Sequence, residues 1–349
     1  MMEGKLSLGG FMELSGINAG TSYPVECGQS YAQLCLADLL KPRLEKAQVA
    51  IITDREVSGY YINDFVRQFV RNGINPTVIV IDGSQAAKSF DVVRSAFERL
   101  TDIEFSKKDL LIALGGGGVI DVAAFVAATY QKGIDYIQVP TSLLAMIDSS
   151  VAGDSFLNFQ SHKNQIGVAS SPARVLIDTD YLRTLPPRFQ ANGIAQAIQF
   201  GLLGNSFLLE LLQEPMIDMM NLVDQSIRSR KLLREKDPRY LSFGQEIAEA
   251  IEGHFRFLKY THGEALALGM LSLYHSDRMK AIYIKFGLPM TVTGVAKDTL
   301  LKRILKNYEN NDNPVSVVRL DDQGQPYIDM IPAADTASFF EKVLSGICT

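Results

Sequence analysis

The chain has few cysteines and no excess of positive charge. Its three cysteines, Cys27, Cys35 and Cys348, are odd in number and show no Cys-x-x-Cys spacing, which argues against a disulfide framework and a zinc knuckle. The net charge of -5 argues against a nucleic-acid or anionic-membrane surface, because both need a basic footprint. We therefore expect a soluble cytoplasmic protein without a nucleic-acid or membrane partner.

Long uninterrupted apolar runs are also missing. The longest, LIALGGGGVIDVAAFVAATY, contains four successive glycines and Asp121, so we expect a strand, a turn and a helix in place of a membrane span. No internal repeat or low-complexity tract is visible. At 349 residues and 47% hydrophobic composition, the chain is long enough for two domains.

Short β-branched runs alternate with helical patterns through the first half of the chain. QVAIIT, TVIVIDG, LLIALG and DYIQVPTS have strand character, and amphipathic segments separate them. This alternation predicts an α/β domain with a parallel, Rossmann-like sheet over residues 1–181. Helical periodicity predicts a mainly α-helical domain over 182–349, with the break near TLPPRF. We expect a small-molecule ligand in a cleft between the two domains.

The motif GGGGVID, from Gly115 to Asp121, lies directly between a predicted strand and a predicted helix. Glycines let the backbone approach a pyrophosphate closely, and a helix N-terminus supplies free N–H groups with a partial positive charge. Plain connectors also use glycine-rich turns, but the preceding strand and helix units favour a dinucleotide site.

A polar pair is predicted on a second helix, in LSFGQEIAEAIEG. Ile247, Ala248 and Ile251 form its apolar stripe, and Gln245 and Glu249 lie one turn apart beside it. This pair is either an ordinary solvated face or part of a site with His262, which follows in an HGEA turn.

Several longer motifs carry a specific resemblance. They are VPTSLLAMIDSSVAGDS, HKNQIG, VLIDTDYLRTLPPR, GIAQAIQFG and HGEALALGM. In order and spacing the chain resembles the 3-dehydroquinate synthase family of sugar phosphate cyclases over most of its length. The resemblance implies an NAD-binding α/β domain, a helical domain with a metal site, a dimer, and cyclisation of a seven-carbon sugar phosphate through transient oxidation.

The resemblance also places the expected metal ligands, and two of the three are changed. A Glu and two His are implied where this chain has Gln196, Gln245 and His262. Neutral amides bind zinc poorly, so we expect no divalent metal. A rearranged site of Gln245, Glu249 and His262 stays open as an alternative.

The implied phosphate pocket is altered as well. Asp154 stands in place of a phosphate-binding lysine, Gln199 in place of a second lysine, and Ser242 in place of an asparagine. One charge pair at about 4 Å is worth roughly 4 kcal/mol at an effective dielectric near 20, so a reversed sign matters. The family positions that are retained, counted as catalytic by the resemblance, are Asp148, Lys163, Asn164 and His262, with Lys132 in place of an arginine that reaches across the dimer interface.

The implied NAD contacts are better preserved. Gln85 replaces a glutamate that accepts from a ribose hydroxyl, and an amide oxygen can still accept that bond. The expected cofactor residues are Asp54, Gln85, Lys88, Gly115, Gly116, Gly117, Asp121, Thr141 and Ser142.

Three interpretations follow. The first is a degenerate homologue that binds NAD, has lost the metal-dependent cyclisation, and acts as a homodimer or as the partner subunit of an active homologue. The second is an NAD-dependent cyclase or oxidoreductase for a non-phosphorylated, polyol-type substrate. The third is an active 3-dehydroquinate synthase, a carbon–oxygen lyase, with a rearranged site.

Overall fold

The computed structural model describes residues 11–15, 22–28, 47–83, 87–160, 162–309 and 313–348. Gln85 and Cys35, both named above, lie outside the described residues. The chain divides into two compact units between Leu185 and Pro186, called here the N-terminal and C-terminal units. Within the described residues, no helix combines the length and the apolar character needed to cross a bilayer.

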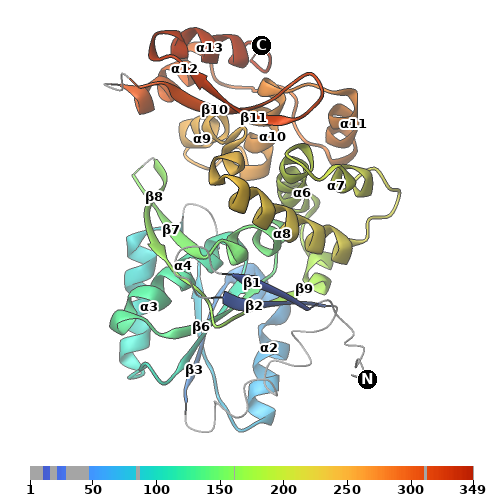
Figure 1. Ribbon diagram of the computed structural model, residues 1–349. Helices are drawn as coiled ribbons and strands as arrows, with labels where there is room; N and C mark the ends of the chain where they lie inside the picture. Colours follow the sequence, from blue (N-terminus) through green and yellow to red (C-terminus); the bar gives the residue numbers. More distant parts are fainter. Residues whose placement is uncertain are drawn as a thin grey trace. The chain divides into compact units, whose positions relative to one another are not determined.

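The N-terminal unit is built on a seven-stranded sheet in the order β1-β2-β9-β6-β5-β3-β4 (Figure 1). The strands are β1 (Phe11–Ser15), β2 (Ser22–Gly28), β3 (Val49–Asp54), β4 (Thr77–Ile81), β5 (Leu110–Gly115), β6 (Asp135–Pro140) and β9 (Arg174–Asp178). Six strands are parallel and only β1 runs antiparallel to its neighbour. The prediction of a parallel α/β sheet is therefore confirmed.

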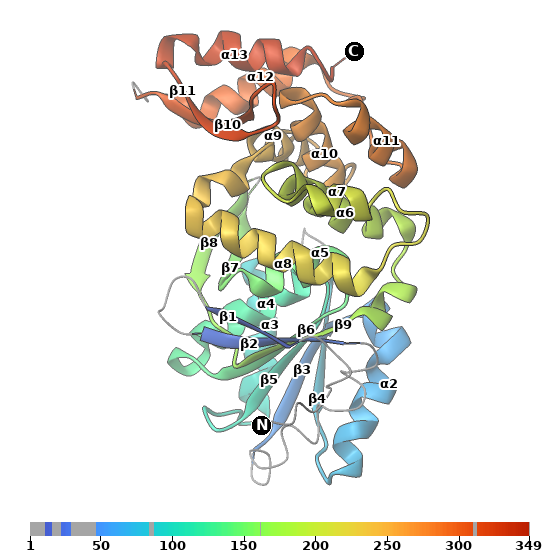
Figure 2. The ribbon, with the colours of Figure 1, turned by 45° about the vertical axis from the view of Figure 1, so that its right-hand side comes forward.

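Helices cover both faces of this sheet, as Figure 2 shows. They are α2 (Arg55–Arg71), α3 (Phe90–Asp102), α4 (Gly117–Thr129) and α5 (Leu143–Ile147). Alternate residues of β3 explain the two layers, because Ala50 and Ile52 join the core formed with α3 and α4 while Ile51 is buried toward the other face. Strands with both faces covered are apolar throughout, as LLIALG in β5 illustrates.

A hairpin outside the main sheet packs on α4. It pairs β7 (Asp154–Phe159) with β8 (His162–Ala169) in antiparallel register, with an irregularity between Leu157 and Phe159. The hairpin covers α4 largely through β7, whose Ser155 and Leu157 are fully buried.

The C-terminal unit is mainly helical, as predicted. Its helices are α6 (Pro187–Leu202), α7 (Ser206–Leu211), α8 (Met219–Lys236), α9 (Gln245–His254), α10 (His262–Leu273), α11 (Asp277–Phe286), α12 (Lys297–Leu305) and α13 (Thr336–Leu344). One antiparallel hairpin, β10 (Val315–Leu320) with β11 (Pro326–Ile331), is added to them. Helix α10 packs against both α6 and α9, and these three helices carry the polar residues discussed below.

Glycines bring α9 and α10 together backbone to backbone. A Cβ on Gly269 would lie 2.1 Å from the carbonyl oxygen of Gly244, and Gly244 itself has a φ of +78°. Helix α9 therefore begins at Gln245, later than the start at Leu241 suggested by the pattern, because the left-handed Gly244 interrupts it. The predicted apolar stripe of Ile247, Ala248 and Ile251 is buried.

Candidate functional site

The glycine-rich turn lies where β5 ends and α4 begins. Gly115 is the last residue of β5, Gly116 is the N-cap residue, and Gly117 starts the helix. A Cβ on Gly115 would lie 2.6 Å from the Val119 side chain, so packing alone requires glycine there. At Gly116 the nearest atom to an added Cβ, Ser142 Oγ, would be 3.6 Å away, an ordinary contact, so packing does not require glycine there.

The neighbouring strand end lies beside the glycine turn. The backbone N–H of Thr141 donates to the carbonyl of Gly115 at 2.9 Å. Ser142 is the N-cap residue of α5, and its hydroxyl accepts from the N–H of Ala145 at 3.3 Å. Two loops that follow adjacent parallel strands thus form one surface, and it contains five of the predicted cofactor residues.

Asp54 ends β3, beside the point in the sheet where the connections between strands begin to run in the opposite direction. From β3 the chain runs through α2 to β4 on one side, whereas β5 runs through α4 to β6 on the other. Open α/β sheets bind nucleotides at such a switch point, outside the carboxyl ends of the strands. Asp54 ends β3 and caps α2 by accepting from Val57 N–H at 2.9 Å. The residue thus has a structural role at the edge where a dinucleotide is expected.

Lys88 and Asp121 form a buried ion pair with each other. Lys88 Nζ lies 2.6 Å from Asp121 Oδ2, and the two side chains are only 3% and 11% exposed. The same Nζ donates to Asn164 Oδ1 at 2.7 Å. Burial raises the pKa of the Asp121 carboxyl, although Lys88 opposes the shift and Asp148 adds to it. Predicted cofactor and catalytic residues therefore meet here, but they bind one another.

The hairpin is held in this network by Asn158, a residue that sequence reasoning missed. Its N–H donates to the carbonyl of Lys88 at 2.8 Å, and its Oδ1 accepts from Asn164 N–H at 3.0 Å. Asn164 has a φ of +52°, a left-handed conformation that asparagine tolerates better than most residues. Ser155 adds a bond from its hydroxyl to the carbonyl of Asp121 at 2.6 Å. The left-handed Asn164 is thereby fixed against Lys88.

The remaining predicted residues of this unit lie at different depths. Asp148 follows α5, Asp154 begins β7, and Lys163 lies on β8, all half-buried. Lys132 is exposed just beyond the C-terminal end of α4. Because α4 has 13 residues, about 20 Å separates that end from the glycine turn. Within one chain, Lys132 is therefore far from the predicted nucleotide site.

In the C-terminal unit, Gln196 at one position assigned to a metal ligand forms a chain of amides with Gln199, which stands at an assigned phosphate position. Gln196 Nε2 donates to Gln199 Oε1 at 2.6 Å, and Gln199 Nε2 donates to the carbonyl of Phe243 at 2.7 Å. Both side chains are buried, at 3% and 0% exposure. Gln196 Oε1 has no hydrogen-bond partner among the described residues. Gln199 thus joins α6 to the segment just before α9.

The HGEA turn is fixed by a capping box and a bidentate ion pair. Thr261 and Glu264 satisfy each other's backbone N–H groups at the start of α10. Arg188 donates to both carboxylate oxygens of Glu264 at 2.7 Å and 2.7 Å. Burial alone would raise the pKa of Glu264, but the bonds from Arg188 and Thr261 hold it below its usual range. Gly263 N–H donates to Asn192 Oδ1, and this bond holds the start of α10, where His262 lies, against α6.

His262 is paired with Glu252, which the sequence analysis did not single out. His262 Nδ1 and Glu252 Oε1 lie 2.9 Å apart, and Glu252 is 1% exposed. A signal was present, because Gln245, Glu249 and Glu252 are spaced i, i+4 and i+7 along one helix. Of these three residues, Glu252 pairs with His262 in the structure, whereas Glu249 is exposed.

Around His262, the described residues offer few strong zinc ligands. No group of three His, Cys, Asp or Glu residues able to hold a metal ion occurs in the part of the chain that the structure describes. At the three positions carried over by the resemblance, His262 is the only residue with a strong zinc ligand. Gln196 presents its amide nitrogen to Gln199 and keeps only a buried oxygen.

Comparison with known sequences gives consistent matches. A family model described as 3-dehydroquinate synthase N-terminal matches residues 78–192. The chain is 30% identical to the 3-dehydroquinate synthase of Clostridium kluyveri over 313 residues, which are 83% of this chain and 87% of that protein. It is 34% identical to that of Pseudomonas fluorescens over 295 residues, covering 77% and 80%.

Solved structures share the fold. A 2-deoxy-scyllo-inosose synthase complexed with carbaglucose-6-phosphate, NAD+ and Co2+ matches with a TM-score of 0.82 at 20% identity, covering 97% of this chain and all of that one. A 2-epi-5-epi-valiolone synthase from Streptomyces hygroscopicus, with NAD+ and Zn2+ bound, matches with a TM-score of 0.81 at 20% identity, covering 95% and 99%.

Proposed function

The chain belongs to the 3-dehydroquinate synthase family, and on that premise we propose that it is a diverged member that binds NAD but does not perform metal-dependent cyclisation of a sugar phosphate. It acts in this proposal as a homodimer, or as the partner subunit of an active homologue. The observation that carries the proposal is the buried amide chain from Gln196 through Gln199 to the carbonyl of Phe243.

The amide chain supports loss of the metal for a chemical reason. A catalytic zinc site needs three protein ligands of imidazole, thiolate or carboxylate type and one open position. Gln196 donates toward Gln199, so only its carboxamide oxygen, a weaker zinc ligand than imidazole or carboxylate, is left to face a cation. The two neighbouring synthase structures contain Co2+ and Zn2+, respectively. A metal in this chain would therefore be the strongest argument against the proposal.

The glycine turn supports the NAD half of the proposal. Packing does not require glycine at Gly116, the N-terminus of α4 directly follows β5, and the turn lies at the switch point of the strands. The N–H groups of Gly116 to Gly118 would hold the pyrophosphate, and Asp54 at the end of β3 would face the ribose. Bound NAD would accept a hydride from a carbon that carries a hydroxyl group. Both neighbouring synthase structures contain bound NAD+.

Metal content is the first test. Elemental analysis of the purified full-length chain, followed by calorimetric titration with Zn2+ and Co2+, should show less than about one tenth of an ion per chain and no tight binding. The Clostridium kluyveri synthase, prepared in the same way, is the positive control. One tightly held ion per chain that disappears in His262→Ala would instead establish a working metal site and favour an active cyclase.

NAD binding is the second test, and Gly116 offers a sharp variant. Calorimetry should give a dissociation constant in the micromolar to millimolar range. Gly116→Ala should weaken binding at least about tenfold without loss of stability, because its methyl group meets Ser142 only at 3.6 Å but would face the pyrophosphate. Gly59→Ala on α2, with no atom within 4 Å, is the matched control. If Gly116→Ala binds NAD with the same affinity as wild type, NAD does not bind at this turn.

Turnover separates this proposal from the two alternative functions. NADH formation with non-phosphorylated polyols, measured by absorbance, would favour an oxidoreductase or cyclase with a new substrate. Release of phosphate from a seven-carbon sugar phosphate would favour the synthase. Binding of NAD with neither reaction, together with co-purification of an active homologue in a mixed dimer, supports the partner role.

A further inference from the structure

The buried ammonium of Lys88 is bonded to the side chain of an exposed residue. The Lys88 side chain is only 3% exposed, and its Nζ donates to Asn164 Oδ1 at 2.7 Å while it pairs with Asp121 at 2.6 Å. Asn164 itself is exposed on β8. An exposed side chain can rotate away without loss of core packing, whereas separating Lys88 from Asp121 would leave a buried charge unpaired. Asn164 is therefore the movable partner of this cation.

A bulge in β8 directs this side chain at Lys88. The two steps along β7 from Leu157 to Phe159 face four steps along β8 from Ile166 to His162, and Asn164 lies inside the longer segment. Its φ is +52°, and its backbone N–H donates to Asn158 Oδ1 at 3.0 Å. Bulges beside functional sites commonly re-aim a side chain. The backbone of Asn164 is thus anchored, and its side chain can rotate without breaking that anchor.

The cation lies close to the glycine turn at the start of the same helix. Gly117 is the first residue of α4, and Asp121 follows four residues later. At 1.5 Å per residue, this spacing corresponds to about 6 Å along the helix axis. The ammonium that pairs with Asp121 is therefore within reach of a dinucleotide whose pyrophosphate is bound at the turn.

We propose that the side chain of Asn164 is a displaceable cover on Lys88, and that a phosphate oxygen of NAD takes its place. This inference rests on the proposed NAD binding. A phosphate oxygen carries charge and the amide oxygen of Asn164 does not, so the ammonium interacts more strongly with the phosphate. An ammonium has three N–H donors, so Lys88 keeps its bond to Asp121 while the other acceptor is exchanged. NAD binding thus replaces one hydrogen bond inside the protein.

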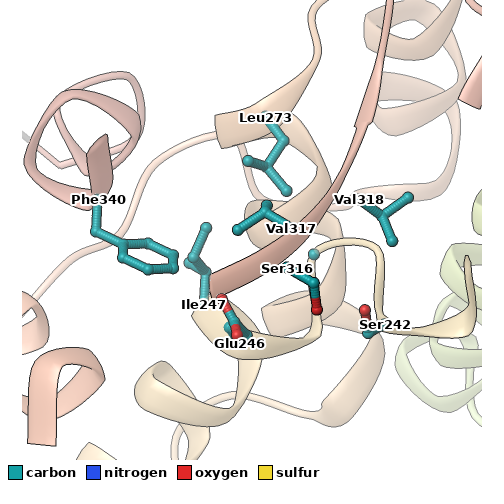
Figure 3. A pocket seen from close by; sticks show the side chains of 9 residues that line it. Ser242, Glu246, Ile247, Leu273, Ser316, Val317, Val318 and Phe340 are labelled. Atoms are coloured by element: carbon teal, nitrogen blue, oxygen red, sulfur yellow. The ribbon is translucent and has the colours of Figure 1, made fainter. Parts of the chain in front are cut away.

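A hollow at the start of α9 shows why a movable group matters. Figure 3 shows it between the apolar side chains of Ile247, Leu273 and Phe340 and the carboxylate of Glu246. It has room for about one water molecule, so no larger ligand enters it. At Lys88, in contrast, rotation of Asn164 exposes a donor to a ligand atom.

The test is calorimetric titration of full-length variants with NAD, and two substitutions at Asn164 act in opposite directions. Asn164→Gly suits the left-handed backbone and removes the competing amide, so NAD should bind at least about threefold more tightly than to wild type. Asn164→Asp keeps the shape but gives Lys88 a charged partner, so NAD should bind at least about tenfold more weakly.

Two control variants lie in the same hairpin. Gln160→Gly relieves a left-handed backbone, with φ of +55°, at an exposed residue and should leave NAD affinity unchanged. Gln165→Glu adds a negative charge at the exposed residue next to Asn164. It should weaken NAD binding less than about threefold, because solvent screens an exposed charge.

A purely structural Asn164 gives a different pattern, because Asn164→Gly would then loosen the hairpin and weaken NAD binding. Weaker or unchanged NAD affinity in Asn164→Gly, or equal losses in Asn164→Asp and Gln165→Glu, would overturn the proposal. A crystal structure of the wild-type chain with NAD should show a phosphate oxygen bonded to Lys88 Nζ in place of Asn164 Oδ1. NAD bound with the Lys88–Asn164 bond intact would refute the cover alone, whereas no NAD binding by the wild type would refute the proposed function as well.

Discussion

Replacing Lys88 by methionine removes the cation that pairs with Asp121 in the interior of the N-terminal unit. The side chains are 3% and 11% exposed and the ion pair measures 2.6 Å, so solvent cannot take over the role of the ammonium. Breaking such a pair from one side costs about 3–5 kcal/mol, because an uncompensated charge stays buried. The same change leaves Asn164 Oδ1 without its donor. We expect a loss near 4 kcal/mol in the free energy of unfolding at about pH 8.

The loss should depend on pH, and its sign follows from Asp121. Burial already raises the pKa of this carboxyl in the folded chain, and removal of Lys88 raises it further. A raised folded-state pKa means that the favourable contribution exists below the unfolded pKa, where the group is protonated, and is lost as pH rises through the folded pKa. The difference between Lys88→Met and wild type should therefore shrink at about pH 5.

The assay is urea denaturation of the full chain followed by circular dichroism, with wild type measured at each pH. The double variant Lys88→Met/Asp121→Asn should recover about half of the loss or more, because it no longer buries a charge. A loss below about 1 kcal/mol at pH 8 would refute the reasoning. A loss of equal size at both pH values, or no recovery in the double variant, would refute it as well.

Three further predictions concern other parts of the chain. Gly269→Ala should lower the free energy of unfolding by about 3 kcal/mol or more, because its Cβ would lie 2.1 Å from the carbonyl oxygen of Gly244. Thermal melts measure this loss. The control Gly59→Ala, whose Cβ has no atom within 4 Å, should lose no stability. Thr261→Ala should cost about 1 kcal/mol through loss of the cap on α10, and Thr261→Ser much less; equal losses would show that the hydroxyl is not what caps the turn. Asp154→Lys should tighten binding of inorganic phosphate in calorimetry, with a gain that shrinks as salt rises; no gain would refute the argument from charge reversal.

Local patterns in the sequence were sufficient for the architecture of the N-terminal unit. Strand-length apolar runs separated by amphipathic helices encode a parallel sheet through periodicity alone, and β5 with its glycine turn was placed to the residue. The extra strands β10 and β11 in the helical unit were not foreseen, because two short strands carry a weaker signal than a long helix.

Motif spacing also predicted a candidate site, but it could not show which groups the site residues contact. Lys88 and Asn164 are 76 residues apart in the sequence, and only the fold of the hairpin over α4 brings them to 2.7 Å. The expected roles of Lys88 and Asp121 toward NAD stay predictions, now beside an observed ion pair between them.

What the sequence alone determined is which residue types stand at the positions carried over by the resemblance, Gln196, Gln245 and Asp154 among them; their roles stay predictions. What only the tertiary structure decided is how the neighbours responded. Gln199 donates its amide to the carbonyl of Phe243, Glu252 pairs with His262, and half-buried Glu246 accepts from the hydroxyl of Tyr308. These outcomes depend on which groups are desolvated together when α6, α9 and α10 pack, and desolvation is a property of the packed interior that residue order does not express.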